Sequence, residues 1–390
     1  MRFLVPRLKP NYDLSDWLSI LNVFNRNKNV ELYEREFSHT FEREFGTMFS
    51  HGRTGIYALL KVWGLNQSEI ICPAYTCVVV PNAIVLSDNI PVFVDCESDS
   101  FNMSLKGIED AITSKTRVII ATHLFGYPMN VIEVDRIARE ASEKYGHKVY
   151  VIQDCAHSYG AYWNGDLVTK YGDAAIFGSN VSKIINSIFG GMVITNSVEL
   201  DSALKKWRIN FCQDAGISKS FKRFIYFSCV NVAFLSPIYS IVNLMERKGF
   251  LDYFVRYYKD GEISFPSDWN FLPCNTEARV GLSQLKKYRT IIDKRVKRAK
   301  NIINQVSKDS DISFKCDEIG ATYSHLVAVV DDREKYVEKY FSKNIQLGIL
   351  IEYSVPEMTS FKKYKTVETP NSDFYARHTI NFPLTKDIDI

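Results

Sequence analysis

Short runs of apolar, often β-branched residues alternate with longer amphipathic stretches over the first half of the chain. The amphipathic stretches, of which Met129–Tyr145 is an example, have the spacing of helices. The apolar runs predict strands at Glu69–Cys72, Pro91–Asp95, Arg117–Thr122, Val149–Asp154, Asp173–Ser179 and Gly191–Thr195. This alternation favours an α/β fold with a mostly parallel sheet covered on both faces, in which ligands bind at the carboxyl ends of the strands.

The N-terminal segment and the second half of the chain have different patterns. Residues 12–49 carry many charges at helical spacing, which predicts helices up to about Gly46. The segment Lys286–Lys300 has eight basic residues at helical spacing. Such a run usually forms a solvated helix face, and a membrane-surface or phosphate-facing role is the alternative.

Phe224–Met245 is a run of 22 residues without a charged side chain. Its length would allow it to span a bilayer. It also contains Asn231, Asn243 and Pro237, which suit a spanning helix poorly. We therefore expect a buried helical hairpin broken at Pro237, with an insert lying on a membrane surface as the alternative.

Composition narrows the function classes. The 390 residues include 48 Lys and Arg against 45 Asp and Glu, and the resulting net charge of +3 argues against a dedicated nucleic-acid binder. The apolar fraction of 46% predicts a folded protein rather than a disordered one. The eight cysteines form no CxxC pair and show no zinc-site spacing with histidine. With no secretory signature at the N-terminus, we expect a reducing, cytoplasmic setting.

Gly52-Arg53-Thr54-Gly55 opens an apolar helical stretch. Backbone N–H groups at a helix start, together with the helix dipole, attract phosphate, and the Thr54 hydroxyl could add a further donor. Small residues at a helix start are also common simply as caps.

Asp154 ends a predicted buried strand, and His157 follows three positions later. A carboxylate at that strand end would face the ligand crevice, and its burial requires a cationic partner such as a protonated pyridine nitrogen. Alternatively, Asp154 caps the next helix and His157 is a structural histidine.

The segment FGSNVSKIINSIFGG places Ser179, Ser182 and Lys183 after another strand and before the pair Gly190–Gly191. A lysine among small and apolar residues is poorly placed for a surface ion pair, and desolvation would lower its pKa, as suits a Schiff-base lysine. An exposed loop lysine is the alternative. Together, a phosphate site, a strand-end carboxylate and such a lysine are the groups that pyridoxal 5'-phosphate needs.

With these three motifs in this order, the sequence resembles the DegT/DnrJ/EryC1/StrS family of sugar aminotransferases, which are fold-type-I pyridoxal-phosphate enzymes. The resemblance covers nearly the whole chain. The matching segments are PAYTCVVVPNAI (73–84), PVFVDCESDSFNM (91–103), THLFGYPMN (122–130), QDCAHSYGA (153–161), FGSNVSKIINSIFGG (177–191), WNFLPCNTEARVGLSQL (269–285) and RHTINFPLTKDI (377–388).

The resemblance implies roles for individual residues. It makes Lys183 the Schiff-base lysine, Asp154 the partner of the ring nitrogen and His157 a ring contact. It implies that Asn270 reaches the cofactor phosphate of a partner subunit, so that the active unit is a homodimer with shared active sites.

The resemblance also implies an activity and a domain plan. The expected reaction transfers an amino group, from glutamate as donor, to a nucleotide-linked keto-sugar for surface polysaccharide or glycan biosynthesis. The sugar nucleotide is expected near Tyr353 and the basic 286–300 segment. The expected domains are a large cofactor-binding domain over 1–250, with an apolar insert at about 221–248, and a smaller α+β domain over 251–390.

Three positions depart from the family pattern. Gly178 stands where the family has a phosphate-binding serine, so Ser179 or Ser182 would have to replace it. Cys77 occupies the position of the ring-stacking aromatic, so stacking is expected to come from Tyr75 or to be absent. Leu272 replaces an arginine.

Two further functions remain open. One is a lyase or dehydratase on the same fold, although dehydrating family members have histidine at the lysine position, so Lys183 favours transamination. The other is a non-catalytic or membrane-associated scaffold that retains the cofactor pocket and has peripheral membrane contact through residues 224–245.

Overall fold

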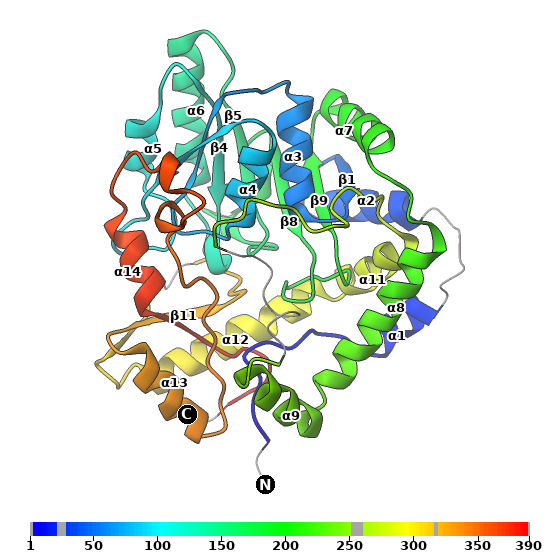
Figure 1. Ribbon diagram of the computed structural model, residues 1–390, viewed down its shortest axis with the longest axis vertical. Helices are drawn as coiled ribbons and strands as arrows, with labels where there is room; N and C mark the ends of the chain where they lie inside the picture. Colours follow the sequence, from blue (N-terminus) through cyan, green and yellow to red (C-terminus); the bar gives the residue numbers. More distant parts are fainter. Residues whose placement is uncertain (1–2, 22–28, 251–259, 316–318, 389–390) are drawn as a thin grey trace.

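A seven-stranded sheet forms the centre of the computed structural model, which describes residues 3–21, 29–250, 260–315 and 319–388 (Figure 1). Its strands, in spatial order, are β1 (Phe45–Phe49), β9 (Gly191–Thr195), β8 (Ala174–Gly178), β5 (Tyr150–Asp154), β4 (Thr116–Thr122), β2 (Glu69–Pro73) and β3 (Ile90–Val94). The strands from β8 to β3 are parallel, and β9 is antiparallel to both its neighbours. The predicted α/β fold and its six strands are confirmed.

The N-terminal prediction was wrong at one point. Helices form at α1 (Leu14–Leu21) and α2 (Asn29–Thr40), but Phe45–Phe49 is strand β1 rather than the end of a helix. Four of its five residues are buried against helices, including Thr47, whose hydroxyl donates to Asp201 at 2.8 Å, so the strand shows no alternation of buried and exposed positions. Residues 22–28 of the predicted helical stretch, Cys316, and residue 251, where the small domain is expected to begin, lie outside the described residues.

Helices cover both faces of the large sheet, because side chains of a strand alternate between faces. Val118 and Ile120 of β4 pack with the core under α3 (Gly52–Val62), α4 (Val79–Leu86) and α7 (Val198–Phe211). Ile119 and Ala121 pack under α5 (Leu105–Ala111) and α6 (Val131–Tyr145). Buried on both faces, each strand is almost entirely apolar, and its polar residues gather at the ends.

A second core lies in the C-terminal third of the chain. The antiparallel sheet β10 (Ile312–Ser313), β11 (Leu326–Val330) and β12 (Thr379–Phe382) packs with α12 (Tyr288–Val306), α13 (Arg333–Ser342) and α14 (Pro370–His378). Helix α11 (Asn275–Leu285) leads into α12, which crosses below the large sheet in Figure 1. The strands β6 (Tyr162–Trp163) and β7 (Asp166–Leu167) form a small separate hairpin.

The charge-free segment forms a helical hairpin. Helix α8 (Gly216–Ala233) and helix α9 (Ser236–Arg247) meet at a bend of 98°, and Pro237 stands in the first turn of α9, as predicted. The prediction that this hairpin is buried was wrong in part, because Phe227 and Tyr239 are buried but several apolar neighbours are exposed. No single described helix is long and apolar enough to cross a membrane. Taken together, the bent pair α8 and α9 has enough length and apolar character to do so.

Candidate active site

Three parallel strands bring polar groups together at their carboxyl ends. Asp154 ends β5, and Thr122 at the end of the neighbouring strand β4 donates its hydroxyl to Asp154 Oδ2 at 3.3 Å. The backbone N–H of Ala156 donates to Asp154 Oδ1 at 3.1 Å. Burial raises the pKa of the Asp154 carboxyl, although these donors and the charge of Lys183 act in the opposite direction. The side chain therefore lies where a cationic group would be strongly bound.

Lys183 follows β8 in a tight turn, where its N–H donates to the Asn180 carbonyl at 3.0 Å. Within the described part of the chain, no carboxylate or other acceptor lies within bonding distance of Lys183 Nζ. Burial lowers the pKa of Lys183, and Arg53 lowers it further, against the opposing effects of Cys77 and Asp154. A desolvated, uncommitted amine of this kind is suited to nucleophilic chemistry.

The tautomer of His157 is fixed by its neighbours. The backbone N–H of Phe125 donates to His157 Nδ1 at 3.2 Å, so in the neutral ring Nε2 carries the hydrogen. Burial and the nearby charges of Lys183 and His325 lower the pKa of His157 well below its usual value. The imidazole is thus a neutral donor through Nε2.

Glycines allow three backbone segments to meet at this edge of the sheet. A Cβ on Gly191, the first residue of β9, would stand 2.3 Å from the Gly52 nitrogen. A Cβ on Gly52 would stand 3.0 Å from the carbonyl oxygen of Phe177 in β8. The start of α3 is therefore held against the ends of β8 and β9, beside the turn that carries Lys183.

The start of α3 has the form that the sequence predicts, with one difference. Gly52 is the first residue of an 11-residue helix, and Arg53 lies close enough to influence the pKa of both His51 and Lys183. The Thr54 hydroxyl donates to the Trp269 carbonyl at 2.8 Å. Its hydrogen is thus committed within the chain, and the N–H groups of Thr54 and Gly55 donate to the His51 carbonyl. Gly52 and Arg53 stay the predicted contacts for a phosphate.

Asn270 lies beside the same helix start in its own chain. The Asp268 carboxylate contacts His51 Nε2 at 2.8 Å, and the Asn270 carbonyl accepts the Gln213 N–H at 2.8 Å. The structure places Asn270 next to the phosphate-binding candidates, and its action on a partner subunit stays a prediction.

The expected replacements for missing family residues have other contacts. The Ser179 hydroxyl is bonded to Tyr159 at 3.2 Å, and the Ser182 hydroxyl donates to Asn180 Oδ1 at 2.5 Å. Tyr75 is fully buried in the C-terminal core and bonded to Thr379 at 3.0 Å, which favours the alternative that stacking on the cofactor is absent. Cys77 is half-buried and lies near Lys183, but it offers no ring.

Sequence reasoning missed His325, which precedes β11 and comes from the C-terminal core. Its ring centroid lies 5.5 Å from that of His157. Burial and the charges of Arg295 and Lys183 lower the pKa of His325 well below its usual value. Arg295, from the basic helix α12, donates to the Tyr323 carbonyl at 2.9 Å and so holds the loop before His325. A lone histidine at a strand start gives no warning of this placement.

A buried charge network beside the site was also missed. Arg223 of α8 contacts Glu277 at 2.6 Å and Asp268 at 2.8 Å. Although burial opposes it, hydrogen bonds and charges from His51 and Arg223 hold the pKa of Asp268 well below its usual value. The network fixes the 268–272 segment against the start of α3.

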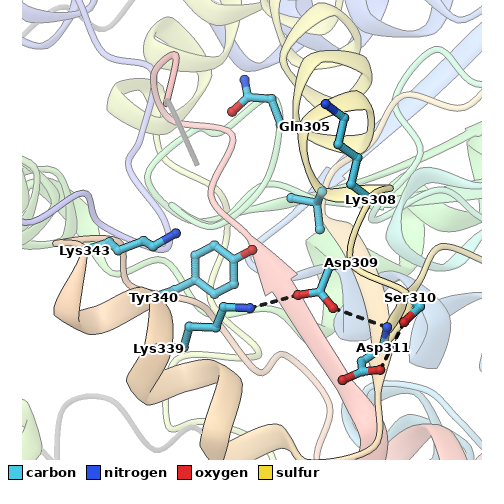
Figure 2. A pocket seen from close by; sticks show the side chains of 9 residues that line it. Gln305, Lys308, Asp309, Ser310, Asp311, Lys339, Tyr340 and Lys343 are labelled. Atoms are coloured by element: carbon cyan, nitrogen blue, oxygen red, sulfur yellow. Dashed lines mark hydrogen bonds and ion pairs between the residues drawn. The ribbon is translucent and has the colours of Figure 1, made fainter.

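A surface hollow of about 490 Å³ lies elsewhere, between the end of α12 and α13 (Figure 2). It shares no residue with the site above. Its Asp309 carboxylate is paired with Lys339 at 2.8 Å.

Comparisons with known proteins identify the family of the chain. A model of the DegT/DnrJ/EryC1/StrS aminotransferase family matches residues 15–230. GDP-perosamine synthase of Escherichia coli O157:H7 is 29% identical over 187 residues, which are 48% of each chain. An uncharacterized protein of Methanocaldococcus jannaschii is 24% identical over 387 residues, covering 95% of this chain and 87% of that protein.

Solved structures share the fold over nearly the full length. Sugar aminotransferase CalS13 from Micromonospora echinospora has a TM-score of 0.78 at 16% identity, covering 98% of this chain and 95% of its own. GDP-4-keto-6-deoxy-D-mannose-3-dehydratase from E. coli, with bound hydrated PLP, has a TM-score of 0.76 at 18% identity, covering 98% and 95%.

The matches to named enzymes are partial: the chain spans about half the length of the first two curated relatives, at 48% and 56%. The family match, in contrast, extends over more than half of this chain and includes the segments that carry Asp154, His157 and Lys183. The protein therefore belongs to the DegT/DnrJ/EryC1/StrS aminotransferase family.

Proposed function

We propose that the protein is a pyridoxal-phosphate-dependent aminotransferase acting on a nucleotide-linked keto-sugar. The observation that carries this proposal is the buried amine of Lys183, which has no partner among the described residues and lies at the same sheet edge as the Asp154 carboxylate. Membership of an aminotransferase family supports it, as do relatives named for nucleotide sugars.

The residues present fit the cofactor. Lys183 would hold its aldehyde carbon, and Asp154 would pair with the ring nitrogen. The start of α3 at Gly52 and Arg53 would bind the phosphate, and His157 Nε2 would donate a hydrogen bond near the ring. A Cβ at Gly178 would meet Lys183 Cε at 3.7 Å and Ala156 at 3.8 Å, which are ordinary contact distances, so this edge of the site is open.

When bound, the cofactor supplies an electron sink and a carrier for the amino group. Lys183 Nζ, whose pKa burial lowers, can take a proton from the substrate carbon and return it. By its negative charge, Asp154 would hold a proton on the ring nitrogen. The neutral His157 would orient the ring without adding a competing charge.

Glutamate as amino donor, a role in surface polysaccharide or glycan biosynthesis, a cytoplasmic location and a homodimer complete the proposal. The dimer is proposed because Asn270 is expected to serve the phosphate of a partner. Tyr353 is a candidate contact for the sugar nucleotide, since its hydroxyl receives the Val78 N–H at 3.1 Å, beside Cys77.

The test uses purified protein loaded with the cofactor. We expect a visible absorption band that glutamate bleaches and that a nucleotide-linked keto-sugar from a panel restores, with ping-pong kinetics. A sugar product that has lost a hydroxyl without gaining nitrogen would instead identify a dehydratase. A colourless protein that fails to bind the cofactor would support a non-catalytic scaffold.

A further inference from the structure

The α8–α9 hairpin is fixed to the rest of the chain along one side. Phe227 of α8 is fully buried, with its ring 4.4 Å from Tyr12 and 4.8 Å from Trp17. On α9, Tyr239 bonds to Gln346 at 2.5 Å and Glu246 pairs with an arginine of the N-terminal segment at 2.5 Å. The hairpin is therefore a docked element with a definite outer side.

That outer side is apolar. Seven of its large apolar side chains, here called the hairpin patch, are between 41% and 61% exposed. They are Phe221, Ile225, Val232, Leu235, Ile241, Leu244 and Met245. On α8 they follow one face at intervals of four and seven residues, and on α9 at intervals of three and four. A contiguous exposed apolar patch on a folded protein usually marks an interaction surface, so the hairpin patch is a candidate for one.

The charges around the patch have one sign. Lys222, Arg247 and Lys248 are exposed beside it. Glu246 is the one carboxylate in Gly216–Arg247, and Arg7 neutralises it. An apolar face bordered by cations matches an anionic lipid surface, in which apolar side chains enter the acyl boundary and cations meet the headgroups.

We propose that the hairpin patch rests on an anionic membrane surface and holds the protein there without crossing the bilayer. The docked inner side, where Phe227 and Tyr239 are buried against the rest of the chain, favours a position on the membrane surface over one across the bilayer. A second copy is the weaker occupant, because a twofold interface would face the patch with itself and bring its cations together. The proposal concerns residues outside the candidate active site and does not depend on the proposed reaction.

The test is flotation of the full-length protein with vesicles. Wild type should float with phosphatidylglycerol-containing vesicles at low salt and remain unbound with pure phosphatidylcholine. The double variant Ile241→Glu/Leu244→Glu should lose at least about tenfold in binding, since charges at the acyl boundary are costly. The matched control is Ile132→Glu on α6, which is 46% exposed and should float like wild type.

The cations provide a second, milder variant. Replacing Lys222, Arg247 and Lys248 by glutamine should weaken binding by about fivefold per charge and reduce its salt dependence. An environment-sensitive probe on Cys229, which is exposed on α8, should shift to shorter wavelength with vesicles, and Cys229→Ser should remove that signal.

Three outcomes would overturn the proposal. The first is that the wild type stays unbound with anionic vesicles, and the second is that the double variant floats as the wild type does. The third is that light scattering shows an oligomer that the double variant breaks, while neither protein binds lipid. The last result would assign the patch to a second copy.

Discussion

The carboxyl edge of the large sheet and the α8–α9 hairpin depart from ordinary folding rules in opposite ways. At the sheet edge, a buried amine, Lys183, lacks a partner among the described residues. On the hairpin, seven large apolar side chains face solvent. Each departure costs stability by itself, and such positions are typically functional. The unpartnered amine indicates that a polar ligand binds at the sheet edge. The exposed apolar side chains indicate that an apolar surface covers the hairpin.

The largest expected effect tests the sheet edge. Lys183→Ala removes the amine, and activity should fall on the order of 10⁴-fold or more, with loss of the visible cofactor band. Lys170→Ala, which removes a lysine paired with Asp166 on the surface, is the control and should keep both. Activity retained in the Lys183 variant would contradict the proposed reaction.

The next largest effect is expected on folding stability. It concerns the charge network that links the two regions. Arg223→Ala removes one cation from the buried Glu277, which keeps Lys219 at 3.4 Å, and from the partly buried Asp268, which keeps His51; the free energy of unfolding should drop by about 3 kcal/mol in denaturant titrations. The exposed Arg289→Ala should stay within about 0.5 kcal/mol of wild type.

The same network predicts the direction of a pH dependence. The folded state lowers the pKa of Asp268 and of Glu277, so their contribution is fully present above the ordinary carboxyl pKa of about 4. It is lost as the pH falls through the folded values. Wild type should therefore lose stability below about pH 4, and Asp268→Asn should make that loss shallower. An unchanged acid limb would rule out this assignment.

A smaller effect is expected from charge alone at the sheet edge. Asp154→Asn keeps a side chain of the same size but cannot hold a proton on the ring nitrogen, so kcat should fall about hundredfold. Asp166→Asn, at an exposed carboxylate, is the control. An equal loss in both variants would show that folding, and not the ring contact, is affected.

A gain of function is expected at Gly178. A Cβ there fits at 3.7 Å from Lys183 Cε, so Gly178→Ser should restore the family's phosphate contact and slow cofactor loss a few-fold. Dialysis followed by absorption spectra measures this. Gly191→Ser, in contrast, would place its Cβ 2.3 Å from the Gly52 nitrogen and should weaken retention.

The smallest effect is expected on the hairpin. In solution, Leu244→Ser should change stability by less than about 0.5 kcal/mol and leave kcat unchanged, because the side chain is 54% exposed. A large loss of stability in the absence of lipid would show that this surface is covered by protein.

The sequence was sufficient for features that depend on local pattern. Short apolar runs predicted six central strands, and Asp154, His157 and Lys183 lie in motifs of adjacent residues. Strand β1 was missed because its residues directly follow a charged segment with helical spacing. His325 and the pairing of His51 with Asp268, 217 positions apart, depend on how distant segments dock, which no local pattern records.

The close approach of Gly191 to Gly52, and of Gly52 to the Phe177 carbonyl, means that this part of the floor of the site is made of main-chain atoms. An inhibitor that bonds to those peptide groups would contact atoms that every amino acid shares. Escape by point mutation would require a side chain where the backbones leave little or no room, so resistance should arise at the rim of the site rather than at its floor.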